Sequence, residues 1–349
     1  MATHPIQTLW ESKGNHLTWE EVEVGAQLQQ LRFPITWKTM AIAAAGTRDF
    51  FPYHHHPTQP KELGMRGPFV NTMFFQGLFS RFTTDWSGPE SFVISLDLQM
   101  VDQLIPGDTA IVSGTVTGKS TDPERVELKL KIENQIGVVA LSTVWLAMPS
   151  RRGDAISPSL EDEALPDPDP AMPAEAKEWY GRELVRQAVY PVSEAQIGLW
   201  ADAVQDANPL YAPTEYAARS RFGGMIAPPV SLLTWIQPRA HQQGPDIRHP
   251  DVDNPDQPPW PNMASGSATA QFRMPGVSEI IVPKITLECG SPYRPGDTVS
   301  MTSSLAACSP RKRTRLGDGY FVTFKEIYKN QLGDITGRIF MTLFQYGTK

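Results

Sequence analysis

Two short segments of the 349-residue chain place a carboxylate and a second proton-active side chain at the same spacing. Asp49 precedes His54 in the first segment and Asp206 precedes Tyr211 in the second, with a proline inside each pair. A carboxylate and an imidazole that meet in a folded protein can take a proton from water and return one. A phenol titrates near ~10, so Tyr211 is a poor substitute for an imidazole at neutral pH. The pattern predicts a duplicated fold in which one copy keeps its chemistry.

An apolar segment follows each copy after a glycine-bearing turn, at 71–81 and at 229–236. The first is apolar around most of its circumference, which is typical of a buried helix. Unpaired N–H groups and the dipole at a helix start favour negative charge, so the Thr72 N–H is a candidate oxyanion donor. Pro229 stands where Thr72 stands in the first copy and has no N–H. We therefore expect one active site per chain, formed by Asp49, His54 and Thr72.

Strands with matching turns follow each predicted helix. A Pro-Gly-Asp turn introduces an alternating strand at 109–117, and the same three residues introduce another at 298–305. A final pair, 319–328 and 335–346, reads as a hairpin. These elements predict an α+β architecture in which an antiparallel sheet wraps a long central helix, twice.

The two halves are separated by a stretch in which acidic residues and prolines alternate. Such a stretch cannot build a core and favours extended backbone. We place a linker at 151–175, a catalytic domain at 1–150 and a degenerate domain that shapes a substrate channel at 176–349. The segment 237–262 has no counterpart in the first half. It is expected to be a surface loop, with a lid over the channel as the alternative.

Composition excludes several classes of function. The formal net charge of -7 argues against a protein dedicated to nucleic acid or to an anionic membrane, because both need a basic face. No apolar run approaches the ~20 residues of a membrane span, and the N-terminus lacks the order of a signal peptide. Cys289 and Cys308 form no disulfide framework. We expect a cytoplasmic protein.

Three other groups of residues have simpler interpretations. The run 54–56 is all histidine, but adjacent histidines rarely share one metal ion, and we predict no metal site. Asp206 and Asn208 have short polar side chains that cap helices or tie turns. The basic cluster 311–315, which includes Arg313, could meet phosphate groups or form a solvated hairpin tip.

The motif around Asp49 resembles the signature of the MaoC-like, (R)-specific enoyl-CoA hydratases (hydratase 2), which have the hot-dog fold. That signature is D-x-N-P-x-H followed by A-H-G-M, and Asp49, Pro52 and His54 match it. The departures are Phe51 for the asparagine, Asn71 for the histidine and Thr72 for the glycine. The stretch 84–89 is similar to the small catalytic subunit of the two-subunit actinobacterial hydratase of steroid side-chain degradation. The stretches 206–211 and 312–321 are similar to the MaoC-like domain of its partner subunit. The chain thus resembles a fusion of both subunits.

The resemblance implies a double hot-dog protein that adds water to a bulky enoyl-CoA, such as a steroid side-chain thioester. Asp49 and His54 would handle the water, and Thr72 would stabilise the enolate oxygen. Substrate-binding positions would be Asn71, Phe51, Tyr211, Asn208 and Arg313. No cofactor is implied, since acyl-CoA is the substrate, and the expected partners are a second copy in a homodimer and a downstream aldolase. The alternatives are another bulky acyl thioester, including one carried by ACP, or a catalytically silent thioester-binding scaffold.

Overall fold

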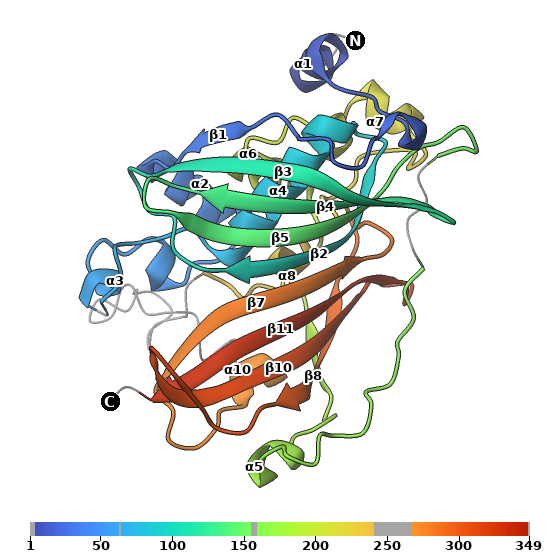
Figure 1. The fold of residues 1–349 in the computed structure, drawn as a ribbon. Helices are drawn as coiled ribbons and strands as arrows, with labels where there is room; N and C mark the ends of the chain where they lie inside the picture. Colours follow the sequence, from blue (N-terminus) through green and yellow to red (C-terminus); the bar gives the residue numbers. More distant parts are fainter. Residues whose placement is uncertain (1–3, 63, 155–158, 241–266, 348–349) are drawn as a thin grey trace, which may run out of the picture.

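A computed structural model describes residues 4–62, 64–154, 159–240 and 267–347. Its described strands form one antiparallel sheet in the order β1-β3-β4-β5-β2-β7-β11-β10-β8-β6, with β9 paired to β10 (Figure 1). The strands are β1 (Leu31–Pro34), β2 (Phe92–Met100), β3 (Thr109–Thr121), β4 (Glu124–Glu133), β5 (Val138–Ala147), β6 (Leu184–Gln187), β7 (Glu279–Cys289), β8 (Ser300–Cys308), β9 (Lys312–Thr314), β10 (Gly317–Lys329) and β11 (Ile335–Gly347).

The strand order shows the duplication directly. The first half reads β1-β3-β4-β5-β2, and the second half reads β7-β11-β10-β8-β6, which is the same order in reverse. The halves join where β2 pairs with β7, with Leu96 opposite Leu287 and Leu98 opposite Ile285. All four side chains are fully buried, so the junction belongs to the core and is not an edge contact. The expectation of a duplicated α+β fold is therefore confirmed.

The strands form where apolar and polar residues alternate. Along β3 the buried positions alternate with partly exposed ones, as expected for a strand with one face on a core. The strands predicted at 109–117 and 298–305 are present as β3 and β8, each shifted or lengthened by a few residues. The hairpin predicted at 319–328 and 335–346 is β10 with β11. The Pro-Gly-Asp turns and the alternation of apolar and polar residues were therefore sufficient to locate these strands in the sequence.

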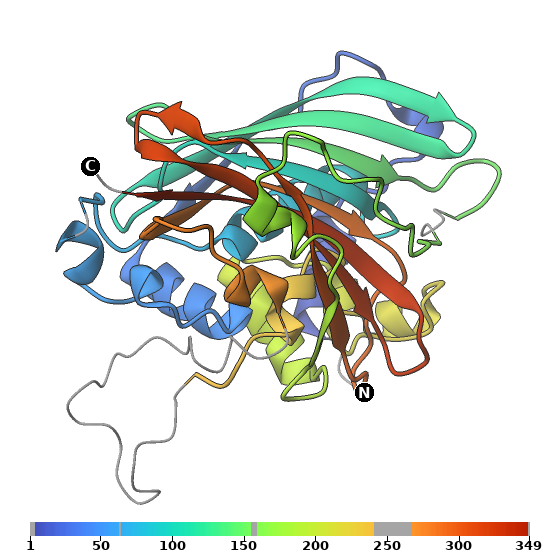
Figure 2. The same cartoon turned by 90° about the horizontal axis from the view of Figure 1, so that it is seen from below.

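The helices lie against the sheet, and α2, α6 and α10 occupy one side of it (Figure 2). The α-helices are α1 (Pro5–Lys13), α2 (Trp37–Thr47), α3 (Gln59–Glu62), α4 (Thr72–Ser87), α5 (Ala174–Lys177), α6 (Glu194–Ala203), α7 (Glu215–Arg219), α8 (Leu232–Trp235) and α10 (Ala268–Gln271). Short 3₁₀ turns are η1 (Trp19–Glu21), η2 (Pro52–His54) and η3 (Pro209–Tyr211). No helix within the described ranges is long and apolar enough to cross a membrane.

Helices α2 and α6 occupy equivalent positions in the two halves and pack closely against each other. A Cβ on Gly46 would lie 2.4 Å from the Leu199 carbonyl oxygen, so only glycine permits this approach. Gln196 Nε2 also donates to the carbonyls of Ala45 and Gly46, at 3.1 and 2.6 Å. These contacts fix the C-terminal end of α2, from which the Asp49 motif continues.

The two central helices differ in length from the prediction. Helix α4 continues to Ser87, six residues past the predicted end at Arg81, and stops at Gly88 with φ 110°. The prediction of an equivalent long helix at 229–236 is wrong, because only the four residues of α8 are helical there. Pro229 precedes α8 and Pro238 follows it, and proline limits a helix at both ends. The apolar residues of this segment signalled burial and not helix length.

The linker predicted at 151–175 is described at 151–154 and 159–175. Its stretch 159–173 contains no strand or helix and contacts the second half, and α5 begins at Ala174. Lys325 Nζ lies 3.2 Å from Asp162 Oδ1, and Arg338 Nη1 lies 3.6 Å from Glu163 Oε2. Its acidic residues therefore meet cations of β10 and β11. The domain bounds at 150 and 176 stay a prediction. Most of the segment 237–262, predicted as a loop or lid, lies outside the described residues.

A buried carboxylate ties together the loops at one end of the first half. Asp108, which is 3% exposed, receives two hydrogen bonds from the Arg66 guanidinium at 2.9 and 3.1 Å. Asn134 Nδ2, Gln135 Nε2 and the Ile105 N–H donate to it as well. Burial acts to raise the pKa of Asp108, but the hydrogen bonds outweigh it and hold the pKa below its usual value. The ionised form is therefore the stabilising one.

Replacing Asp108→Ala should lower the free energy of unfolding by about 3 kcal/mol, because it leaves the Arg66 cation without its buried partner. The stabilisation by Asp108 is present above its unfolded pKa and is lost as pH falls through the lower folded pKa. Asp297 is the matched control, since it holds the equivalent Pro-Gly-Asp turn of the second half and, among the described residues, accepts hydrogen bonds from the Arg294 N–H and from Gln331 Nε2. Asp297→Ala should cost about 1 kcal/mol in urea unfolding at neutral pH. Equal losses for the two variants would contradict this interpretation.

Asp206, the second copy of the acidic motif, is buried beside another carboxyl group. It is 5% exposed, its Oδ1 accepts from the Asn208 N–H at 2.9 Å, and its Oδ2 has no hydrogen-bond partner in the described part of the chain. Burial and the nearby charge of Asp85 raise the pKa of Asp206 to about 7. The folded protein thus holds a proton on Asp206 at a pH where the unfolded chain has released it.

A raised carboxyl pKa means that the folded state loses stability as pH rises from the unfolded value near ~4 toward 7. Asp206→Asn removes this titration and should flatten the pH dependence of unfolding. Urea unfolding of both proteins at about pH 5 and about pH 8 measures the difference. Between these two pH values the free energy of unfolding of the variant should rise relative to that of the parent by more than about 1 kcal/mol. An unchanged pH dependence would show that Asp206 titrates normally.

Candidate active site

The first-half motif brings Asp49 and His54 together at the end of α2. His54 Nε2 lies 3.4 Å from Asp49 Oδ2. Asp49 Oδ1 accepts the Phe51 N–H at 3.3 Å, a local turn that orients the carboxylate. Arg48 starts this turn in the left-handed region, with φ 59°, and its guanidinium reaches the second half, donating to the Pro238 carbonyl at 3.2 Å.

A single backbone contact determines the tautomer of His54. His54 Nδ1 lies 2.8 Å from the Phe69 carbonyl oxygen, which can only accept, so Nδ1 carries the proton. In the neutral ring Nε2 is then an acceptor, and it faces Asp49. The imidazole also meets the Phe69 ring edge to face at 5.2 Å, and Tyr53 stacks on Phe69 at 6.1 Å. Aromatic rings thus hold the imidazole, of which 13% is exposed.

The start of helix α4 lies beside this pair and is held by Asn71. Asn71 Oδ1 accepts the Phe74 N–H at 3.0 Å, and its Nδ2 donates to Thr47 Oγ1 at 2.6 Å. Asn71, predicted to bind substrate, has a buried side chain that caps the helix, and it does not line the cavity described next. Thr72 does line it. As the first helical residue, Thr72 has an N–H without an intrahelical partner.

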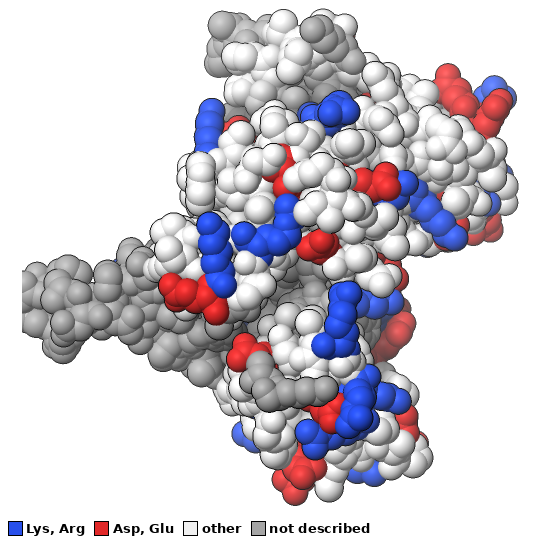
Figure 3. All heavy atoms as spheres, turned by 60° about the vertical axis from the view of Figure 1, so that its left-hand side comes forward, with Lys and Arg blue, Asp and Glu red and all other residues white. Residues whose placement is uncertain are grey.

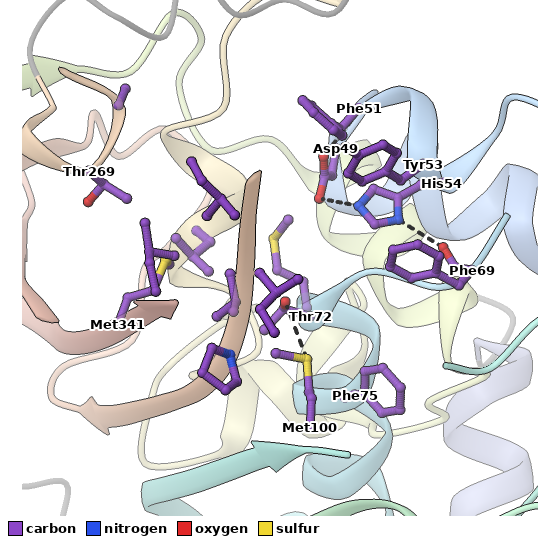
Figure 4. A pocket seen from close by; sticks show the side chains of 18 of the residues that line it. Asp49, Phe51, Tyr53, His54, Phe69, Thr72, Phe75, Met100, Thr269 and Met341 are labelled. Atoms are coloured by element: carbon purple, nitrogen blue, oxygen red, sulfur yellow. Dashed lines mark hydrogen bonds and ion pairs between the residues drawn. The ribbon is translucent and has the colours of Figure 1, made fainter. Parts of the chain in front are cut away.

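A cavity of about 590 Å³ begins at Asp49 and His54 and continues into the second half. Figure 4 shows Asp49, Phe51, Tyr53 and His54 on one side and Thr269 and Met341 on the opposite side. The middle is apolar, with walls formed by Val70, Met73, Phe75, Met100, Leu233, Ile236, Ile280, Ile281, Val282, Met301, Met341 and Leu343. Asp102 and Ser278, at the ends of β2 and β7, are exposed and mark where the cavity reaches solvent.

The cavity includes Phe51, which the sequence assigned to substrate binding, but excludes three other residues so assigned. Tyr211 belongs to the buried core, and Asn208 is a buried turn residue whose Oδ1 accepts the Leu210 N–H at 3.0 Å. Arg313 is exposed on β9 and pairs with Asp318 at 3.1 Å. None of the three lines the cavity.

The sequence analysis did not predict the polar residues at the far end of the cavity, because they belong to no recognisable motif. They are Arg186, Ser267, Thr269, Arg273 and Glu326. The available signal was weak: Arg186 and Glu326 are charged residues in strands otherwise rich in apolar positions. The pairing of distant strands makes them neighbours, and no spacing in the chain encodes that.

The three histidines at 54–56 bond to different backbone groups. His55 Nε2 lies 3.0 Å from the Phe50 carbonyl, and His56 Nδ1 accepts the N–H of Thr58 at 3.3 Å and of Gln59 at 3.0 Å. No cluster of three potential metal-binding side chains occurs among the residues with described positions.

Residues 178–336 match the model of the FAS1-like dehydratase domain region. Over 125 residues, 36% of this chain, the sequence is 31% identical to the 3-oxo-4,17-pregnadiene-20-carboxyl-CoA hydratase beta subunit of Mycobacterium tuberculosis and covers 95% of that subunit. Over 160 residues, 43% of this chain, it is 24% identical to the corresponding alpha subunit of that organism but covers only 42% of it.

Among solved structures, a Mycobacterium tuberculosis protein described as having a double hotdog fold superposes with a TM-score of 0.60. The superposition covers 95% of this chain and 99% of that one at 12% identity, so it bears on fold alone. It confirms the double hot-dog architecture. The beta-subunit match covers nearly a whole relative, and the two halves of the chain are consistent with a fusion of two subunits. The chain therefore belongs to the MaoC-like enoyl-CoA hydratase family.

Proposed function

We propose that this chain is an enoyl-CoA hydratase that adds water to a bulky α,β-unsaturated acyl-CoA, with Asp49, His54 and Thr72 as its catalytic groups. One observation carries the proposal: the Asp49–His54 pair lies at the end of an apolar cavity that also contains the start of helix α4. Residues 1–150 would supply the chemistry, and residues 176–349 would form the distal part of the acyl channel.

The geometry accounts for each step of the addition. A water molecule that lies beside the pair, on the cavity side, can donate one hydrogen bond to Asp49 Oδ2 and one to His54 Nε2, which are 3.4 Å apart, and this leaves a lone pair for the β-carbon. As the C–O bond forms, Asp49 takes a proton from water and the π electrons move to the thioester oxygen. The Thr72 N–H, with the dipole of α4 behind it, meets that enolate oxygen. The α-carbon then takes the proton back, and the pair is restored.

The size of the cavity supports a bulky acyl group. Helix α4 fills the first half with 16 residues, whereas α8 has only four, and the cavity extends into that part of the second half. A steroid side-chain thioester is the substrate class we propose, supported by the substrate that the name of the beta-subunit relative specifies.

The carrier is expected to enter where the cavity reaches solvent. Lys and Arg side chains lie on both halves of the molecule on that face (Figure 3), which supports a phosphate-bearing carrier such as CoA. A catalytically silent thioester-binding scaffold, the other class, has no need for a histidine tautomer fixed toward a carboxylate.

Asp49→Asn and His54→Ala should each lower kcat/KM by about 10²–10⁴, because each removes one of the two groups that handle the water. Activity is measured as the loss of ultraviolet absorbance of the conjugated thioester. Asp206→Asn and Tyr211→Phe change the matching positions of the second copy and should leave kcat/KM unchanged. An inactive parent across acyl chain lengths would favour the scaffold, and active Asp49 and His54 variants would exclude these residues from catalysis.

Thr72→Pro should lower kcat by about 10²–10³, because it removes a single oxyanion donor. Proline is well tolerated at the first helical position, so α4 should still form. Thr72→Ala keeps the N–H and is the matched control, expected to retain most of the activity. Circular dichroism of both variants checks folding, and equal activity of the two would show that the N–H is not a catalytic group.

A further inference from the structure

The second-half end of the cavity is polar, although the walls leading to it are apolar. Glu326 of β10 is 3% exposed and lines the cavity together with Arg186 of β6, which is 9% exposed. A buried charge costs free energy unless its partners compensate, so two charged groups beside an apolar channel call for a physical reason.

Strand pairing places these groups on one face of the sheet. Arg186 is opposite Met301 on β8, and Met301 is opposite Tyr328 on β10, so the three side chains form a row across three strands. Glu326 lies two residues before Tyr328 and shares its face. The row faces α10, whose Thr269 contributes the next contact.

Glu326 is fully hydrogen-bonded on this face, and Arg186 is not. Thr269 Oγ1 donates to Glu326 Oε1 and the Tyr328 hydroxyl donates to Oε2, both at 2.8 Å. Arg186 has five N–H donors, yet its guanidinium makes no hydrogen bond or ion pair to any residue whose position is described. Burial lowers the pKa of Arg186, and its neighbours Tyr328 and Glu326 oppose that effect. A buried cation with free donors therefore lies in the wall of the cavity.

The charges around the cavity decide what those donors can bind. Arg186 and Arg273 are the lining cations, and Glu326 and Glu279 balance them within the second half. Asp49 and Asp102 add negative charge from the first half. A carboxylate on the ligand would add to this excess of negative charge around the cavity. An uncharged carbonyl oxygen adds no charge and needs only hydrogen-bond donors. Both Glu326 oxygens already accept hydrogen bonds, so a ligand hydroxyl gains less there than a carbonyl gains from Arg186.

We propose that Arg186 binds a keto oxygen at the far end of the acyl tail, so that the cavity recognises its substrate at both ends. This inference rests on the proposed function for its ligand class, a long acyl-CoA. The thioester end is held near Thr72, the apolar middle packs on residues such as Met301 and Met341, and the keto oxygen completes the hydrogen bonding of Arg186.

The test measures binding and turnover separately. Calorimetry with three saturated acyl-CoAs of one polycyclic tail, ending in a keto, a methylene or a carboxylate group, gives the dissociation constants without catalysis. The parent should bind the keto form at least about 10-fold more tightly than the methylene form, since the latter leaves the buried donors unpaired. Arg186→Met should bring that ratio to about 1, while Arg182→Met, an exposed arginine on the same segment, should leave it unchanged.

A second variant does not depend on the stability of the first. Glu326→Gln keeps the shape of the side chain and removes the negative charge, so it should bind the carboxylate-tailed ligand about 10-fold more tightly than the parent does. Equal binding of keto and methylene forms by the parent, or a ratio unaffected by Arg186→Met, would overturn the inference. Hydration of the polycyclic enoyl-CoA that ends in the methylene group is assayed in parallel, because it does not need a keto oxygen at Arg186. The absence of this activity would refute the proposed function alone.

Discussion

The pairing of β2 with β7 is the contact on which the rest of the molecule depends. It joins two half-sheets into one, and each half then curves around its own helices on the same side of the sheet. The register is fixed by buried leucine and isoleucine pairs, since a slip of one residue would turn these side chains to the opposite face. Because the cavity lies against both strands, Asp49 and Arg186 can line the same space despite their separation in sequence.

The elements that position the candidate catalytic residues could be predicted from the sequence. The Asp49–His54 spacing, the apolar helix after it and the Pro-Gly-Asp turns all follow local rules, and the structure contains each of them. What the sequence could not give is the contact that fixes the His54 tautomer, because the Phe69 carbonyl is a backbone group on a separate loop. That loop is held in turn by Arg66 and Asp108, a pair separated by a whole helix and strand.

Two differences between prediction and structure have a common physical cause. Asn71 was assigned to substrate from its place in a motif, but the helix start needed a cap and Asn71 supplies it. The long second helix was inferred from apolar residues, and prolines on both sides of α8 limited it. In both cases a local backbone requirement outweighed the pattern: a family motif for Asn71, and the correspondence between the two copies for α8. Similarity between copies predicts topology well and predicts side-chain roles poorly.

The second copy shows how a fold can change use without changing its framework. The position of Tyr211 became part of the core, and Asp206 became a buried acid whose proton is retained near neutral pH. Pro229 stands at the position of Thr72 and has no N–H, and the helix that follows it has only four residues. The shortened helix leaves room next to strands β6, β8 and β10, and the polar residues on those strands then face the cavity. The missing N–H at Pro229 and the short helix α8 thus belong to one short segment, which borders the cavity through Leu233 and Ile236.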